Sequence, residues 1–275
     1  MWDNVLHTGE DVYAEEMVTV DESMEDVDTA SQSNEPAACN LECPHLAEEN
    51  TDQPVLNTCQ CMVYNIVTTH LQSFLRGDNP PQRLMIVHGQ GGMGKSVLLN
   101  EISKSFEKQN VSALLAKTAM SGVAASIVGG QTLHSWAALP VQPPSTDDWL
   151  THPSKRIGKR RQDNIGNVLW LTIDKKSMLT TPNLHLLSKT MGIVRSGVET
   201  IKSSLPFGGV NTILLGDFHQ FPPIRAKHNA LYYACPEKDN VQLGRSSYEQ
   251  FDIVIKLEEQ MRIQDQVWQD ILLRC

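Results

Sequence analysis

The feature that most constrains the fold is a glycine-rich turn between a short apolar run and a segment expected to be helical. Residues 84–88 read LMIVH, residues 89–94 read GQGGMG, and Lys95-Ser96 follow. Strand, glycine turn, Lys-Ser and helix in this order match the phosphate-loop (P-loop) template. The glycines let backbone N–H groups point inward at the helix N-terminus, where they bind phosphate. The sequence therefore predicts a nucleoside triphosphate site.

The expected site joins this loop to an acidic residue elsewhere in the chain. Lys95 would reach the β- and γ-phosphates of ATP, and the Ser96 hydroxyl would ligate Mg²⁺. Asp174 follows the apolar run LWLTI and would hold the metal from the end of a neighbouring strand. The loop residues expected to bind the nucleotide are Gly89, Gln90, Gly91, Gly92, Met93, Gly94, Lys95 and Ser96.

The residue after Asp174 is a lysine, whereas P-loop proteins that hydrolyse their nucleotide usually have a glutamate there to polarise the attacking water. Loss of a general base typically reduces the rate by ~10²–10⁴. The Lys175 cation would also repel Mg²⁺. Alternatively, Lys175 could neutralise the γ-phosphate and hold ATP without turnover.

Apolar runs and helical periodicities alternate from residue 54 onward, which predicts a parallel sheet covered by helices on both faces. Residues 140–165 interrupt this pattern with four prolines and a basic cluster, so we expect a surface insertion there. The expected strands are 84–87, 111–116, 168–173, 210–215 and 253–257, and the expected helices are 63–74, 96–108, 122–128 and 265–274.

Charge divides the chain into two parts. The first 75 residues contain 15 of the 32 acidic residues and no Lys or Arg, so the rest has 23 basic against 17 acidic residues, a net charge of +6. Residues 1–53 are polar and acidic, which predicts a disordered leader. A basic body behind an acidic tail suits a polyanion-binding domain with a self-masking leader. An unrelated tail on a nearly neutral domain explains the charges equally well.

No apolar stretch approaches the ~20 residues that a membrane span needs. The acidic N-terminus also lacks the basic and apolar regions of a secretory signal. We therefore expect an intracellular, soluble protein that does not bind membranes.

Several segments together resemble the Pif-type (petite integration frequency) DNA helicases of superfamily one, and most closely those of Helitron transposons. The string GDFHQFPPI at 216–224 is similar to the family's third motif, GDFxQLPPV. Residues 173–178, IDKKSM, resemble its IDExSM motif with the glutamate replaced. Residues 56–60, 118–125, 130–135, 207–210 and 257–262 resemble further family segments.

The resemblance implies a three-layer RecA-like P-loop NTPase domain over residues 54–275 and a role for each matching residue. Gln60 would read adenine, and Gln220 would sense the γ-phosphate and couple it to DNA. Arg262 would approach the γ-phosphate from the domain edge. The expected catalytic set is Lys95, Asp174, Gln220 and Arg262, and the residues expected along single-stranded DNA are Thr118, Thr132 and His134.

The run KRIGKRR at 155–161 has five cations in seven residues. Lys155 and Arg156 are candidate contacts to DNA phosphates, which would make binding dependent on salt. The run could also be a nuclear-localisation patch or simply a solvated loop.

The resemblance implies an ATP-dependent 5′-to-3′ DNA helicase, with ATP and Mg²⁺ as cofactors. It would act as a monomer on single-stranded DNA or tailed junctions, in repair, recombination and telomere maintenance. We expect the nucleus, or alternatively the mitochondrion. Helicases of this type need a second RecA-like domain, and the sequence ends at Cys275, just after the fourth motif. The alternative is a degenerate ATP- and DNA-binding module or transposon remnant without helicase activity.

Overall fold

The computed structural model describes residues 56–140, 148–196, 205–224, 226–233 and 239–261. The expected leader over 1–53, the expected helix over 265–274 and Arg262 lie outside the described residues.

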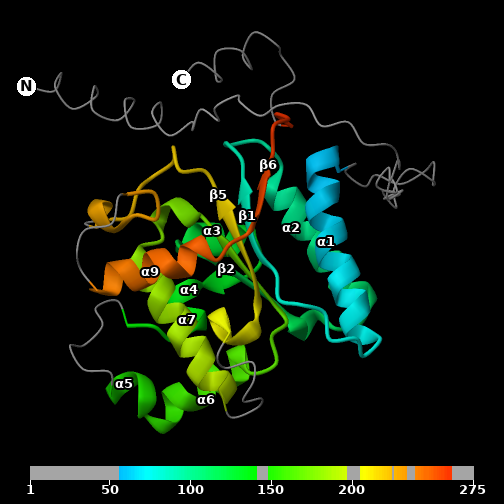
Figure 1. Ribbon diagram of the computed structural model, residues 1–275. Helices are drawn as coiled ribbons and strands as arrows, with labels where there is room; N and C mark the ends of the chain where they lie inside the picture. Colours follow the sequence, from blue (N-terminus) through cyan, green and yellow to red (C-terminus); the bar gives the residue numbers. More distant parts are fainter. Residues whose placement is uncertain (1–55, 141–147, 197–204, 225, 234–238, 262–275) are drawn as a thin grey trace, which may run out of the picture. The chain divides into compact units, whose positions relative to one another are not determined.

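A six-stranded sheet forms the centre of the described fold (Figure 1). Its strands lie in the order β3-β2-β4-β5-β1-β6, and every neighbouring pair is parallel. The phosphate-loop strand β1 is therefore flanked by β5 and β6. The strands are β1 Leu84–His88, β2 Leu115–Ala119, β3 Gln131–Thr132, β4 Trp170–Asp174, β5 Asn211–Gly216 and β6 Ile253–Lys256.

Helices cover both faces of the sheet, as parallel strands with their crossover connections require. The α-helices are α1 Thr58–Leu75, α2 Lys95–Lys108, α3 Gly122–Ile127, α4 Leu133–Trp136, α5 Asp148–Thr151, α6 Lys155–Ile165, α7 Thr181–Ser196 and α9 Asp239–Glu249. Short 3₁₀ turns are η1 Ser112–Leu114, η2 Lys176–Met178, η3 Pro206–Gly209 and η4 Lys227–Asn229. None of the described helices is long and apolar enough to span a membrane.

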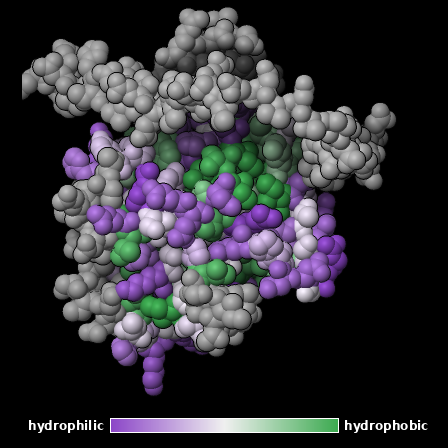
Figure 2. All heavy atoms as spheres, in the orientation of Figure 1, coloured by the Kyte–Doolittle hydropathy of each residue, from purple (hydrophilic) through white to green (hydrophobic). Residues whose placement is uncertain are grey.

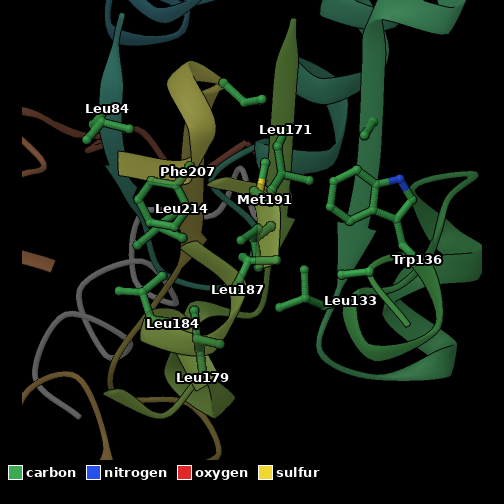
Figure 3. Packing of buried hydrophobic residues seen from close by; sticks show 14 of the residues in the cluster. Leu84, Leu133, Trp136, Leu171, Leu179, Leu184, Leu187, Met191, Phe207 and Leu214 are labelled. Atoms are coloured by element: carbon green, nitrogen blue, oxygen red, sulfur yellow. The ribbon is translucent and has the colours of Figure 1, made fainter. Parts of the chain in front are cut away.

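Alternate residues of the buried strands feed two hydrophobic cores. On one face, Met85 and Val87 of β1 pack with the apolar sides of α1 and α2. On the other, Leu84 and Ile86 pack with α7 and its neighbours. Figure 3 shows the second core, in which Leu184, Leu187 and Met191 of α7 pack with Leu214 of β5 and Phe207. The three-layer α/β architecture predicted from the sequence is confirmed.

The outer surface is mostly polar. In Figure 2, hydrophilic residues gather along α1 and at the lower end of the view, where α6 lies. A hydrophobic cluster lies over the upper strands. β6 is an edge strand of the sheet and leaves Val254 61% exposed.

The insertion expected at 140–165 is only partly a surface feature. Within its described part, α5 and α6 bury Leu150 and Ile165 in the fold. Arg161, from the middle of the basic run, is 2% exposed and donates to the backbone oxygens of Leu150 and Ala138. One face of α6 therefore packs on the domain while most of the helix stays exposed, and the predicted bounds of the surface insertion stay a prediction.

Gly244 lets α9 pack closely against the start of α7. A β-carbon at this position would overlap the backbone carbonyl of Thr181 at the start of α7. Backbone atoms cannot rotate away as a side chain can, so the helices would have to separate. We expect Gly244→Ala to lower the free energy of unfolding by about 3 kcal/mol, measured by urea denaturation.

Gly122 in the first turn of α3 provides the matched control. No heavy atom lies within 4 Å of its would-be β-carbon. Gly122→Ala should therefore change stability by no more than ~1 kcal/mol, towards greater stability. Equal losses in the two variants would contradict the packing argument.

Candidate nucleotide-binding site

The phosphate loop connects β1 to α2 and is shaped by two glycines with positive φ. Gly92 has φ 90° and Gly94 has φ 72°, a region that other residues rarely adopt. Gly94 is the N-cap of α2 and provides no side-chain cap, and Ser96 is exposed in the first helical turn. The N–H groups at this helix end are thus placed to bind an anion.

Lys95 folds back over the loop that it follows. Its ammonium donates to the backbone oxygens of Gly89 at 2.5 Å and Gln90 at 2.7 Å. The charge therefore lies within the loop, where the β- and γ-phosphates of a nucleotide would be expected.

Two buried aspartates lie at the carboxyl ends of β4 and β5, the two strands that follow β1 on one side of the sheet. Asp174 ends β4 and is 9% exposed, and Asp217 follows β5 and is 6% exposed. Because these strands are parallel, their carboxyl ends meet at the edge of the sheet that carries the phosphate loop. The hydroxyl of Ser96 and the carboxylate of Asp174 are oxygen ligands of the type that Mg²⁺ prefers. The donor set fits the metal, whereas the Lys175 ammonium nearby opposes it.

Lys175 makes a specific contact with the third motif. Its backbone is left-handed, with φ 62°, and its ammonium donates to Gln220 Oε1 at 2.7 Å. The other end of that amide, Gln220 Nε2, lies 4.0 Å from the position of a β-carbon on Gly91. This chain of contacts places the Lys175–Gln220 pair beside the phosphate loop.

Lys176 is fully buried beneath the same edge, which the sequence did not predict. Within the described residues its ammonium has no hydrogen-bond partner, and it lies 4.6 Å from the centre of the Phe218 ring. Burial lowers the pKa of Lys176 to about 7; Asp217 opposes this shift and Lys95 adds to it.

His88, the last residue of β1, reports the same environment. Burial lowers the pKa of His88 to about 4, and the positive charge of Lys176 adds to the shift. The start of the phosphate loop is therefore both desolvated and positive.

Gly216 explains how Lys176 reaches this place. Its φ is 142°, and a β-carbon there would lie 3.0 Å from the backbone nitrogen of Lys176. Only glycine lets the turn after β4 pack so closely on the end of β5. The glycine of the GDFHQFPPI string is the sequence signal for this contact, but it does not identify the residue that contacts it.

Gln60 is fixed against the loop by the N-terminus of α1. A capping box joins it to Asn57, with Gln60 N donating to Asn57 Oδ1 at 2.9 Å and Asn57 N donating to Gln60 Oε1 at 3.0 Å. The side chain is fully buried, and its Nε2 lies 3.2 Å from the backbone oxygen of Met93 and 3.3 Å from Met261 Sδ. Its predicted role in adenine recognition stays a prediction.

The fourth-motif segment crosses the phosphate loop. Gln260 Nε2 donates to the backbone oxygen of Gly91 at 3.0 Å, and Met261 N donates to that of Gly92 at 3.0 Å. The sequence placed this segment near the γ-phosphate through Arg262, but it did not predict these two contacts. Their signal was the resemblance of residues 257–262 to the fourth motif.

The residues predicted along DNA differ in their surroundings. Thr118 is fully buried, and its hydroxyl donates to the backbone oxygen of Thr172 at 2.7 Å. With no exposed atom it is not placed to touch DNA, and it joins β2 to β4 instead. Thr132 is half-buried and caps α4 through Ser135 N. His134 is half-buried too, and burial lowers its pKa.

The basic helix α6 lies against α4, which brings two of the predicted DNA segments together. Arg160 Nη2 donates to Ser135 Oγ at 2.8 Å, and Asn164 Nδ2 donates to the backbone oxygen of Trp136 at 2.6 Å. The exposed cations of α6 are Lys155, Arg156, Lys159 and Arg160. The segment that contains Thr132 and His134 thus borders a positively charged surface.

Comparison with known proteins identifies related sequences. ATP-dependent DNA helicase PIF1 of Saccharomyces cerevisiae is 37% identical over 143 residues, which cover 51% of this chain and 16% of that protein. ATP-dependent DNA helicase Pif1 of Psychrobacter is 31% identical over 139 residues, covering 50% of this chain and 20% of the relative. The chain thus spans no more than a fifth of the length of these two relatives.

Solved structures show the same fold. The crystal structure of Pif1 helicase from Candida albicans matches with a TM-score of 0.59 at 27% identity, over 80% of this chain and 44% of that one. Bacteroides Pif1 bound to ssDNA matches with a TM-score of 0.54 at 19% identity, over 80% of this chain and 46% of that one. Residues 56–271 also match the family described as PIF1-like helicase. The chain therefore belongs to the PIF1-like helicase family.

Proposed function

We propose that this chain provides the ATP-binding motor domain of a PIF1-like DNA helicase and that, with Lys175 in place, it holds ATP but hydrolyses it weakly. Three contacts support the nucleotide site: the Lys95 ammonium inside the loop, the Gln60 amide on Met93, and Gln220 beside Gly91. Bacteroides Pif1, which has the same fold, has been solved in complex with ADP-AlF4.

The observation that carries weak hydrolysis is the 2.7 Å hydrogen bond from Lys175 Nζ to Gln220 Oε1. An ammonium ion cannot accept a proton from the attacking water, so the position lacks a general base. The same contact ties up the oxygen of the amide proposed to sense the γ-phosphate. Both effects slow the reaction without loosening the phosphate loop. The second candidate function is that of a degenerate module that binds nucleotide without turnover. Both effects favour it.

Single-stranded DNA is the proposed partner, along the surface formed by α4 and α6. The exposed cations Lys155 and Arg156 would contact phosphates, and Thr132 and His134 border them. Duplex unwinding with 5′-to-3′ polarity and action in the nucleus are proposals for the whole protein. Ser96 and Asp174 are the residues that would ligate Mg²⁺ where a metal accompanies the nucleotide.

ATP turnover by the 275-residue chain, measured with and without single-stranded DNA, tests the proposal. We expect negligible turnover in the native protein and at least ~100-fold more in Lys175→Glu, because the substitution supplies a base. Lys175→Gln is the matched control: it removes the cation without supplying a base and should gain far less. Comparable DNA-stimulated turnover in the native protein and Lys175→Glu would contradict the proposal that Lys175 weakens hydrolysis.

A further inference from the structure

Three lysines lie at the edge of the sheet that carries the phosphate loop. Lys95 lies in the loop, and Lys175 and Lys176 follow β4 at the same edge. Asp174 ends β4 and Asp217 follows β5 at this edge, and Glu258 and Glu259 lie in the segment that crosses the loop. Replacing Lys175 by glutamate would change the charge beside the loop by −2.

The Lys175 charge is not neutralised by an ion pair within the described residues. Its one hydrogen bond within the described residues goes to the neutral amide of Gln220, and no described carboxylate forms an ion pair with it. Gln220 Nε2 in turn faces Gly91 of the phosphate loop. A positive charge without an ion-pair partner among the described residues thus lies beside the phosphate loop.

The buried ammonium of Lys176 is an independent sign of an anionic ligand. It is fully buried and has no hydrogen-bond partner within the described residues, an arrangement that destabilises a folded protein. Its ammonium lies 4.6 Å from the centre of the Phe218 ring, in the segment that also carries Gln220. A polyphosphate in the loop is the kind of group that would compensate it.

We propose that this phosphate loop binds a nucleoside triphosphate without a divalent cation, with the Lys175 ammonium in the charge-neutralising role that Mg²⁺ has in other P-loop sites. The inference rests on the proposed function, because it takes the loop to be the ATP site. Mg²⁺ next to Asp174 would meet the Lys175 charge, and the two cations would repel each other. The uncomplexed triphosphate meets no such repulsion.

Calorimetric titration of the full chain with ATP, once with excess Mg²⁺ and once with EDTA, tests this inference. We expect the two dissociation constants of the native protein to agree within about threefold. In Lys175→Glu, ATP should bind at least ~10-fold more weakly in EDTA than to the native protein, and Mg²⁺ should restore much of the affinity.

Lys108→Glu makes the same charge change far from the phosphate loop. Lys108 is the last residue of α2, about 20 Å from Lys95 at the start of that helix at 1.5 Å per residue. It should leave both dissociation constants unchanged. If native binding weakens tenfold or more in EDTA, or if Lys175→Glu binds as well as the native protein there, the metal-free site is refuted and the ATP site stands. If ATP binds in neither buffer, the proposed function itself is refuted.

Discussion

Replacement of Lys95 by alanine should weaken ATP binding at least ~100-fold. The ammonium lies within 2.7 Å of the Gln90 oxygen, inside the curve of the loop, and is placed to bond two phosphate oxygens. Hydrogen bonds to charged groups contribute about 1.5–3 kcal/mol each, and every 1.4 kcal/mol is a factor of ten in affinity. Two such bonds therefore account for the expected loss, which isothermal titration calorimetry would measure.

The fold should survive this substitution. Lys95 is half-buried, and the two loop oxygens that it now bonds can be hydrated in its absence. Lys108→Ala, at the exposed end of α2, is the control and should keep native affinity. An unchanged ATP affinity in Lys95→Ala, with native circular dichroism, would mean that the loop at residues 89–96 does not bind the nucleotide.

The central strands could be predicted from sequence because parallel strands buried on both faces are nearly continuous apolar runs. β1 and β5 are of this kind, and both lie where their runs predicted them. β2 starts four residues later than predicted, at Leu115 instead of residue 111, because Ser112–Leu114 forms a 3₁₀ turn. Apolar character extends over both the turn and the strand, so it does not mark the boundary between them.

Helix α7 was missed although its signal is present in the sequence. Leu184, Leu187 and Met191 recur at helical spacing and are fully buried, but polar residues and Pro182 separate them from any strong apolar run. The phosphate loop, by contrast, was recognisable because the backbone needs glycine at fixed positions. A backbone requirement for glycine is visible in the sequence itself. The burial of a helix with interspersed polar and apolar residues depends instead on the elements that pack against it.

The surroundings of individual polar side chains could not be predicted. Thr118 and Lys176 both belong to motif-like segments, and both prove to be fully buried. For Thr118 the reason is its position as the second-last residue of β2, which pairs with β4. For Lys176 it is the close packing of the turn on Gly216. Such contacts join residues far apart in the chain, so neither neighbouring sequence nor spacing reveals them.

Lys176→Met should stabilise the protein by roughly 2–4 kcal/mol at pH 7. The substitution removes a buried charge without a hydrogen-bond partner in the described residues, keeps a long flexible chain, and lets sulfur contact the Phe218 ring. Urea unfolding of the two proteins would measure the difference. Lys175→Met, one residue away on a half-buried and hydrogen-bonded side chain, is the control and should change stability by less than about 1 kcal/mol.

The gain should depend on pH in a defined direction. Burial lowers the folded-state pKa of Lys176 to about 7 from 10.5, so between these values the unfolded chain binds one more proton than the native one. Native stability attributable to Lys176 therefore rises with pH through this window and is lost as the pH falls towards 7. The advantage of Lys176→Met should be largest at pH 7 and below, and should shrink towards pH 10.5.

Destabilisation by Lys176→Met at pH 6.5 would show instead that the ammonium is well compensated in the free protein. The expected stabilisation has a consequence for the nucleotide site. A residue that lowers stability at the edge of a binding site is commonly retained for function, since the lost stability is regained when a ligand binds. If an anion compensates Lys176, saturating ATP should raise the unfolding midpoint of the native protein more than that of Lys176→Met. Stability of the free protein and its response to ATP should thus change in opposite directions in this one variant.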